Sequence, residues 1–397
     1  MGNWQMNKKV VFWALLTVCL ALFIEFGSYL AVTITQEILQ EARTSNIFLT
    51  DNHSFTQSDI DSYFDSRDPI LGWPTPAILQ SDRHDESGAR PNPAYPYPQP
   101  GCVAAFGDSF TYASEVSHAE GWANQLSKRL GCRVANFGVG GYGTDQAYLR
   151  FKQTNVDDAS VVILGFFPED IERNVNQYRG FLSGNHNLVF KPRYLVHDGE
   201  LELVPIIQRE NFNYDELIKD PKKFLKYEYF LPGTAFGPVS VKFPFTLTAI
   251  EALFHPKILA FISGQPTWAK LYREDSDSGG LETTEAILRQ FAADVRNMGK
   301  FPLVFVFTNA KSVDHFRDSR VWPFQSVLDF MDREQIQYIN FGQYLDANFD
   351  LARICEIFTK QIVFGCTGHH TAEGNRLVAD SIYRFITDGD LLSHGGS

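Results

Sequence analysis

The sequence has no excess of basic residues and no cysteine spacing that suits a metal. Its 397 residues include 35 Lys and Arg against 47 Asp and Glu, which gives a formal net charge of −12. An acidic protein repels phosphate backbones, so we expect no nucleic-acid partner. The five cysteines form no C-x-x-C pair, so we expect no metal site. Internal repeats are absent, which argues against a repeat architecture.

Charge is nearly absent from Val10 to Ile34, where Glu25 is the one charged residue. As a helix this stretch is about 37 Å long, enough to cross a bilayer. A cleaved signal peptide is the alternative, but the apolar run is long and no A-x-A-like site follows it. We therefore expect residues 1–36 to form a cytoplasmic tip and a single-pass anchor. Lys8 and Lys9 precede the run, so the positive-inside rule places the remaining chain outside the cytoplasm, in the periplasm or on the cell surface.

Four cysteines follow the anchor, in which Cys19 lies. In an oxidising compartment an even number favours disulfides, and four cysteines allow three pairings. The order of the expected elements favours one of these pairings, which consists of two bonds. Cys102–Cys132 joins the starts of two strands of one sheet, and Cys355–Cys366 closes a short loop before a histidine.

Beyond the anchor, the chain divides by composition into two parts, the second of which contains an insertion. Residues 37–100 read as a stalk that leads into a proline-rich approach segment, with a proline-rich run at 91–100. Residues 101–390 alternate short apolar runs with amphipathic stretches. Between about 176 and 280 this alternation stops, apart from a hairpin with an Asp198-Gly199 turn. We interpret 176–280 as an insertion that covers or flanks the site, or else as a structural flap.

The alternation predicts an α/β fold with a doubly wound parallel sheet. Buried parallel strands are short and rich in Val, Ile and Phe. The expected strands are Val103–Phe106, Val134–Phe137, Val161–Phe167, Leu303–Phe307 and Tyr338–Phe341. The expected helices are Gly121–Leu130, Asp145–Lys152, Glu282–Met298, Pro323–Arg333 and Ala372–Ile386. Ligands of such sheets bind beyond the carboxyl ends of the strands.

Ser109 stands at such an end, in Gly107-Asp108-Ser109-Phe110, directly after the first expected strand. A serine on a tight turn between strand and helix exposes its hydroxyl, as a nucleophile requires. The motif is not the G-x-S-x-G elbow of α/β-hydrolases. An ordinary turn or helix N-cap is the alternative interpretation.

Two further blocks carry chemistry. The glycine-rich stretch from Asn136 to Gly143 follows the second strand, where glycine backbone N–H groups can face an oxyanion. The alternative, a phosphate-binding loop, lacks an evident acidic partner for a ribose, so we expect no cofactor. His369, in a loop before the last helix and five residues ahead of Gly374, is a candidate base. A lone histidine is more often structural.

In this order the three blocks resemble the SGNH (GDSL-type) hydrolase superfamily, over Gly101–Phe167 and Leu303–Phe385. The resemblance implies a flavodoxin-like three-layer α/β/α fold and ester hydrolysis or acyl transfer. It assigns Ser109 as nucleophile, His369 as base, and Ser109 with Gly141 as oxyanion donors. His370 is then out of register. The motifs Gly141–Gln146, Arg173-Asn174 and Lys191-Pro192 look like those of a membrane-anchored subgroup.

Two departures from the superfamily pattern concern polar groups of the site. Where an oxyanion Asn is usual, this chain has Glu169 or Asp170, and Asn174 is the candidate substitute one helical turn later. Cys366 and Thr367 occupy the place of the acid that orients the histidine. Catalysis would then use a Ser109–His369 dyad without a carboxylate from the His block, and a backbone carbonyl could orient the ring.

Three functions remain open at this point. The first is an extracytoplasmic esterase or deacylase acting on an O-acylated small molecule or polysaccharide. The second is an O-acyltransferase of cell-surface or secreted polysaccharide that works with envelope polysaccharide machinery. The third is a degenerate module that binds glycans or serves as a scaffold, which the missing polar residues would suit. Labelling of Ser109 by a fluorophosphonate separates the third from the first two.

Overall fold

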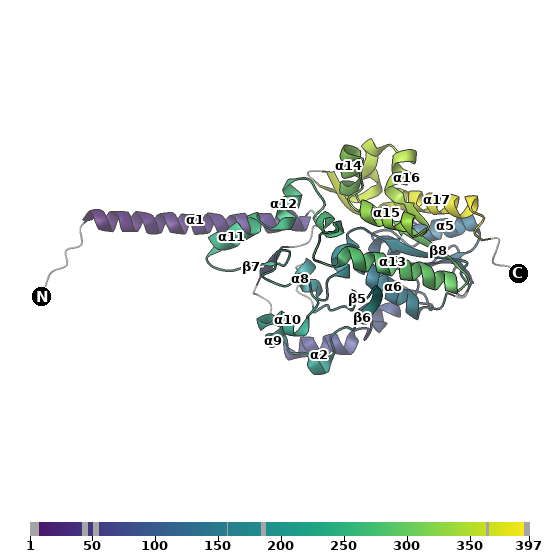
Figure 1. Ribbon diagram of the computed structural model, residues 1–397, viewed down its shortest axis with the longest axis horizontal. Coiled ribbons are helices and arrows are strands. Elements are labelled where there is room, and N and C mark those ends of the chain that lie inside the picture. Colours follow the sequence, from purple (N-terminus) through teal and green to yellow (C-terminus); the bar gives the residue numbers. More distant parts are fainter. Residues whose placement is uncertain are drawn as a thin grey trace.

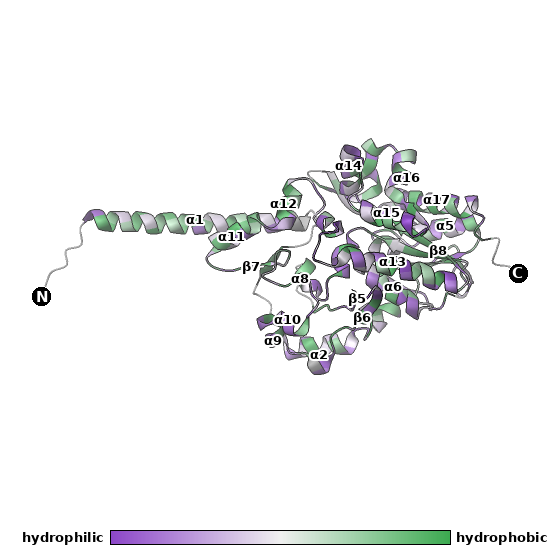
Figure 2. Ribbon diagram, viewed as in Figure 1, coloured by the Kyte–Doolittle hydropathy of each residue, from purple (hydrophilic) through white to green (hydrophobic). Residues whose placement is uncertain are grey.

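The computed structural model describes residues 8–41, 47–50, 55–156, 158–183, 188–362 and 365–392. Residues 1–7 of the expected cytoplasmic tip and residues 42–46 and 51–54 of the expected stalk lie outside these ranges. Helix α1 (Lys8–Glu41) extends away from a rounded α/β body (Figure 1). Its span Lys8–Ile38 is long and apolar enough to cross a membrane, which suits either a membrane anchor or a signal sequence (Figure 2).

The body is built on a five-stranded parallel sheet with the order β3-β2-β4-β8-β9. All five strands expected from the sequence are present. Their side chains are buried almost throughout, which explains the continuous apolar runs. The order places the first strand beside both the second and the third, as in flavodoxin-like folds. The strands are β2 (Gly101–Phe106), β3 (Arg133–Asn136), β4 (Val161–Phe166), β8 (Phe301–Val306) and β9 (Tyr338–Asn340).

Helices cover both faces of the sheet (Figure 1). On one face α5 (Trp122–Leu130) packs against α17 (Ala372–Asp388). On the other face α13 (Gly280–Asn297) packs against α6 (Thr144–Gln153) and α15 (Gln325–Arg333). The three-layer architecture and all five expected helices are thus confirmed, with ends shifted by a few residues.

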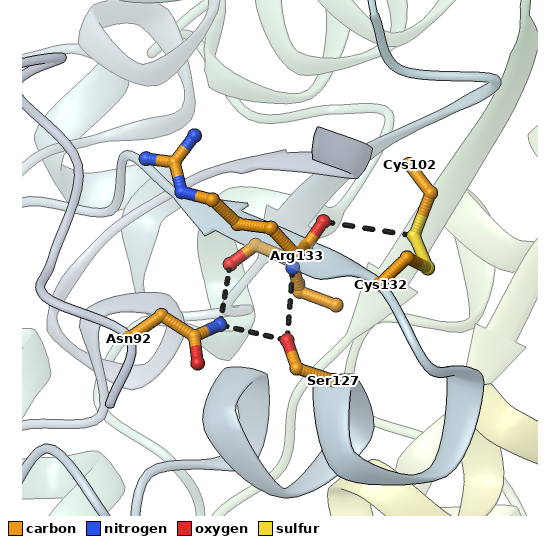
Figure 3. The surroundings of a disulfide bond; sticks show 6 residues. Asn92, Cys102, Ser127, Cys132 and Arg133 are labelled. Atoms are coloured by element: carbon orange, nitrogen blue, oxygen red, sulfur yellow. Dashed lines mark hydrogen bonds between the residues drawn. A yellow bond between two sulfur atoms is a disulfide. The ribbon is translucent and has the colours of Figure 1, made fainter. Parts of the chain in front are cut away.

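Both expected disulfides form. Cys102 and Cys132 are joined next to the paired starts of β2 and β3 (Figure 3). Beside this bond the Asn92 side chain donates to Ser127 Oγ at 2.7 Å and ties the approach segment to α5 (Figure 3). The second bond, Cys355–Cys366, joins η3 (Leu351–Ile357) to β11 (Gly365–His370). Each bond therefore braces an element that leads into one of the three sequence blocks described above.

From residue 55 on, the segment expected to be stalk and approach packs against the body. It contains α2 (Gln57–Ser66) and α3 (Pro76–Leu79). The Trp73 indole donates to the Gly140 carbonyl at 2.9 Å, and Gln146 donates to the Leu71 carbonyl at 2.7 Å. The segment thus forms part of the wall around the glycine-rich loop.

The expected insertion at 176–280 contains mostly short elements. The hairpin is confirmed: β5 (Arg193–His197) and β6 (Glu200–Val204) join at Asp198 and Gly199, which both have positive φ as a type I′ turn requires. β7 (Val239–Val241) pairs in parallel with β1 (Phe48–Thr50) just after the anchor. The remaining elements are α8 (Arg179–Ser183), η1 (Arg209–Asn211), α9 (Tyr214–Lys219), α10 (Pro221–Phe224), α11 (Phe245–Leu253), α12 (Pro256–Ile262) and η2 (Ala269–Tyr272).

The sequence did not reveal the hairpin that carries His369. β10 (Phe358–Ile362) and β11 pair in antiparallel fashion, so the expected loop before α17 is a strand. Its residues, Gly365-Cys-Thr-Gly-His-His370, lack the apolar alternation that marks a strand. Two short helices beside it, α14 (Ala310–Ser319) and α16 (Phe341–Asn348), were also not expected.

Candidate active site

Ser109 begins the short helix α4 (Ser109–Tyr112) at the carboxyl end of β2. The buried carboxylate of Asp108 caps this helix by accepting from the Phe110 N–H at 2.8 Å. Gly107 makes the turn tight, because a Cβ there would lie 2.0 Å from Thr111 Oγ1. The turn therefore places Ser109 at the sheet edge where ligands of this fold class bind.

The glycine-rich loop packs directly on the serine turn. Val139 N–H donates to the Gly107 carbonyl at 2.9 Å, and the Asn136 amide donates to the Thr111 carbonyl at 2.6 Å. A Cβ on Gly138 would lie 2.4 Å from the Tyr112 nitrogen, so a larger residue would separate the two segments. A Cβ on Gly140 would lie 4.0 Å from the Ser109 Cβ. Gly140 thus stands beside the serine, and Gly141 is the next residue of the loop.

His369 lies on β11, which runs next to α4. The rings of His369 and Phe110, the residue after Ser109, have centroids 5.0 Å apart. The His369 Nδ1 is 3.3 Å from Glu115 Oε1. The second oxygen of Glu115 accepts from the Thr359 hydroxyl and lies 3.5 Å from the His369 backbone nitrogen. The structure thus places a carboxylate beside His369, unlike the carbonyl-oriented dyad that the sequence led us to consider.

Glu115 reaches this position through an unusual backbone conformation. Its φ is +71°, a left-handed value that non-glycine residues rarely adopt and that often marks functional sites. Arg90, from the approach segment, holds the loop by donating to the carbonyls of Tyr112, Ala113 and Val116. Burial of this guanidinium lowers the pKa of Arg90. The approach segment therefore holds the loop that carries the Glu115 carboxylate.

His370 has a different environment from its neighbour. Its side chain is buried, and its ring contacts four aromatic rings, those of Phe110, Phe307, Phe341 and Phe358. Burial and the adjacent His369 lower the pKa of His370 to about 3, so the ring is neutral at ordinary pH. This residue belongs to the core.

The glycine and asparagine that follow the histidines fix the strand to α17. A Cβ on Gly374 would lie 2.7 Å from the Ile357 carbonyl oxygen and 2.8 Å from the His370 Cβ. The Asn375 amide donates to the His370 carbonyl at 3.0 Å and accepts from Trp122 N–H at 3.1 Å. These contacts explain why the His block extends beyond the histidine itself.

The two carboxylates at the departed Asn position turn toward an arginine. Arg173, in α7 (Asp170–Asn174), lies 2.5 Å from Asp170 Oδ1 and 3.7 Å from Glu169 Oε1. It also lies 3.3 Å from Asp108 Oδ2 and donates to the Tyr142 carbonyl at 2.9 Å. Burial and the Asp108 carboxylate raise the pKa of Asp170 well above its usual range. Burial also raises the pKa of Glu169, although Arg173 pulls it down.

Asn174 lies inside a buried polar network. Its side-chain oxygen accepts from Asp145 N–H at 3.1 Å, and its nitrogen donates to Thr284 Oγ1 at 2.9 Å. Lys191 is buried against Asp145, and its ammonium also donates to the Arg173 carbonyl at 2.9 Å. The subgroup motifs noted in the sequence therefore meet in one place. The oxyanion role of Asn174 stays a prediction. In the structure its side-chain amide makes the two hydrogen bonds of this buried network.

A pocket of about 350 Å³ opens beside the glycine loop. The Arg179 guanidinium and the Trp73 indole lie 4.0 Å and 3.7 Å from where a Cβ on Gly141 would stand. Burial and the nearby Arg173 lower the pKa of Arg179 to about 10, which leaves it charged at neutral pH. Other lining residues come from the approach segment and the insertion: Tyr63, Ser66, Arg67, Gly72, Thr75, Leu188 and Val189.

Within the described ranges, no group of three His, Cys, Asp or Glu side chains is placed to hold a metal ion.

The structure therefore brings together the turn of Ser109, the loop of Gly141 and the strand of His369. It adds Glu115 and Arg179, which the sequence analysis did not identify. Glu115 lies six residues after Ser109 and outside any expected motif position. A carboxylate in the loop after the candidate nucleophile, in a chain whose His block lacks one, is the signal that could have indicated it.

No protein-family model and no curated protein sequence match this chain. Solved structures give distant likenesses. A member of the lipolytic protein G-D-S-L family from Veillonella parvula is 11% identical, with a TM-score of 0.32 and coverage of 72% of this chain and 97% of that one. The acetyl xylan esterase AlAXEase is 14% identical, with a TM-score of 0.34 and coverage of 72% and 98%. TesA is 10% identical, with a TM-score of 0.35 and coverage of 72% and 98%. TM-scores this low support no inference about function, so function is inferred from the residues of the site itself.

Proposed function

We propose that this chain is a serine esterase or deacylase of the SGNH superfamily, with Ser109 as nucleophile, His369 as base and Glu115 as the orienting carboxylate. The observation that carries the proposal is the Glu115–His369 contact of 3.3 Å on a strand beside the serine turn. A nucleophile near a base that a third group orients is the arrangement that activates a serine. A buried structural histidine, such as His370, has no such carboxylate.

In the proposed mechanism, His369 Nε2 takes the hydroxyl proton as Ser109 Oγ attacks the acyl carbon. The Glu115 carboxylate stabilises the imidazolium that forms and holds the ring with Nδ1 toward it. The tetrahedral intermediate collapses, the C–O bond breaks, and the proton passes from His369 to the leaving alcohol. Water then attacks the acyl-serine, with His369 acting as base again, and releases the acid and free Ser109.

The backbone N–H groups of Ser109 and Gly141 are the proposed oxyanion donors. Removal of one such donor typically costs about 3–4 kcal/mol of transition-state stabilisation. The Arg179 guanidinium beside Gly141 supplies positive charge near this position. The carboxylates of Glu169 and Asp170 are held by Arg173, so they are directed away from the role of the usual amide.

We place the catalytic domain outside the cytoplasm, with α1 as an uncleaved anchor and Lys8 and Lys9 on the cytoplasmic side. Two disulfides support an oxidising compartment. An exported, anchored enzyme meets envelope or secreted polymers, and O-acylated carbohydrate is therefore the favoured substrate. The pocket wall of Trp73 and Arg179 suits a polar ligand with an apolar face. Protease added to spheroplasts should digest the domain, and protection until lysis would contradict this orientation.

Hydrolysis of a chromogenic acetyl ester by the full-length chain in detergent tests the function. We expect Ser109→Ala and His369→Ala each to remove almost all turnover. His370→Gln serves as the matched control, because it alters the neighbouring histidine and keeps a polar side chain. Loss confined to His370→Gln would show that the register is wrong. Analysis of products with an added sugar alcohol separates hydrolysis, which releases free acid, from transfer to the alcohol.

A further inference from the structure

Helix α11 exposes its large apolar side chains and buries a side made of small residues. Thr248 and Ala252 face inward, toward a small core that also contains Val32 of α1. A surface helix of a water-soluble domain has the reverse pattern. Phe243 and Phe254, at the two ends of the helix, are 72% and 74% exposed. The other exposed apolar side chains of this surface are Leu247, Ile250 and Leu253, with Leu259 and Ile262 on α12.

The same helix is fastened to α1. The carboxylate of Glu25 accepts from the Phe245 N–H at 2.6 Å and from the Thr246 hydroxyl at 2.5 Å. Ser28 Oγ lies 3.3 Å from Thr246 Oγ1, and the rings of Tyr29 and Phe245 have centroids 5.1 Å apart. Figure 1 shows α11 running alongside α1, outside the α/β body. Glu25, the one charge in the apolar run, thus satisfies the free N–H groups at the start of a second helix.

The position of Glu25 along α1 sets the depth of α11. Glu25 comes about 16 residues after Lys9, or about 24 Å along a helix, and the hydrocarbon core of a bilayer is about 30 Å thick. With Lys9 at the cytoplasmic surface, the tip at Phe243–Phe245 lies roughly 6 Å inside the opposite boundary of that core. From there α11 runs outward beside α1, toward Val32.

We propose that Phe243–Phe254, continued by the exposed face of α12, is a wedge that inserts into the outer leaflet of the membrane that α1 crosses. This proposal rests on α1 being an uncleaved anchor, as in the proposed function. The occupant of the apolar surface is the lipid of that leaflet, acyl chain around the tip and the headgroup boundary farther along α11, because this surface is continuous with the exposed apolar surface of α1. A carboxylate at this depth would be costly, and its contacts with α11 offset that cost.

The polar residues around the wedge agree with this depth. Lys242 and Glu251 are exposed. Lys242 lies at the level of Thr248, whose hydroxyl contacts its carbonyl at 3.1 Å, about one helical turn above the tip. Glu251 is a further turn outward. Both charges therefore reach the headgroup layer, and the bend of 60° between α11 and α12 turns the chain back along the surface. The wedge fixes the height and tilt of the catalytic domain above the lipid.

Fluorescence quenching on the full-length chain in phosphatidylcholine–phosphatidylglycerol vesicles tests the wedge. Cys19 is the free cysteine among the described residues, and its replacement by Ala leaves both disulfides intact. A bimane label is placed by Leu247→Cys and, as a matched control, by Met298→Cys, an exposed apolar site at the far end of α13. Quenching is compared between iodide in the water and nitroxide on the lipid acyl chain near the headgroup.

We expect the label at position 247 to be quenched at least about threefold more by the lipid nitroxide than by iodide, as for a group below the headgroups. The label at 298 should show the reverse. Equal behaviour of the two labels would overturn the proposal, and shielding of position 247 from both quenchers would show that protein covers α11. If the chain does not float with the vesicles, α1 is not a membrane anchor, and the proposal is overturned with it. None of these outcomes depends on esterase activity, so a failed catalytic proposal leaves the result interpretable.

Discussion

The Glu115 carboxylate lies 3.3 Å from Nδ1 of His369, although the two residues are 254 positions apart in the chain. Glu115 lies in the loop that follows the short helix begun by Ser109, and His369 lies on the hairpin next to this helix. The proposed orienting carboxylate and the proposed base therefore come from opposite ends of the α/β body. In the proposed mechanism this contact gives His369 the orienting carboxylate that its own sequence block lacks.

Glu115→Gln is predicted to lower kcat of ester hydrolysis by about two to four orders of magnitude while KM changes little, because the amide cannot stabilise the imidazolium. Glu356→Gln is the control, since that exposed carboxylate pairs with Arg353 at the surface. Steady-state kinetics against pH checks both variants. Equal activity of Glu115→Gln and wild type would show that Glu115 does not contribute and that Ser109 and His369 act as a dyad.

Arg173→Ala is predicted to destabilise the fold by about 3–5 kcal/mol, because Asp108 and Asp170 would be buried without their cation. The double variant Arg173→Ala/Asp170→Asn should recover part of this loss. Arg289→Ala is the control, and removal of its exposed pair with Glu334 should cost less than about 1 kcal/mol. Thermal unfolding in detergent measures all three. An Arg173→Ala variant as stable as Arg289→Ala would contradict the role assigned to this arginine.

The sequence was sufficient to predict the sheet, because each strand of a doubly wound fold is a separate apolar run such as Val161–Phe166. It also indicated both disulfides. It could not indicate Glu115, since a left-handed residue and the Arg90 contacts that hold it are tertiary features. The packing of residues 55–100 on the body was hidden for a similar reason: prolines and polar residues predict extended chain, whereas single side chains such as Trp73 make the contacts.

Stability is predicted to fall as the pH drops from about 6.5 toward about 4. The pKa of His370 is lowered from 6.5 to about 3 in the folded chain by burial, and that of His255 to about 4. Between these values the unfolded chain binds protons that the folded chain does not. The free energy of unfolding therefore decreases by up to about 1.4 kcal/mol per pH unit for each histidine.

His370→Gln removes one of these two groups, so its unfolding free energy should depend less steeply on pH than that of the wild type. Thermal or denaturant unfolding at a series of pH values measures the slope. Identical slopes in the two proteins would show that His370 is not buried in its neutral form.

Arg179→Ala is predicted to raise KM at least about tenfold, because a half-buried guanidinium would be lost from the pocket wall beside Gly141. Arg179→Lys keeps the charge but not the planar donor, and an intermediate KM is expected. Kinetics on acetylated sugars measures both variants. Unchanged KM in Arg179→Ala would place substrate elsewhere than in this pocket.

The central claim is that Ser109 is an activated nucleophile, and covalent labelling tests it most directly. The full-length chain is treated with a fluorophosphonate probe and digested, and the modified peptide is identified by mass spectrometry. The account predicts one adduct, on Ser109, that is absent in Ser109→Ala, strongly reduced in His369→Ala and retained in His370→Gln. No adduct on wild-type protein that is folded, or an adduct that persists in Ser109→Ala, would contradict the account and favour a glycan-binding module.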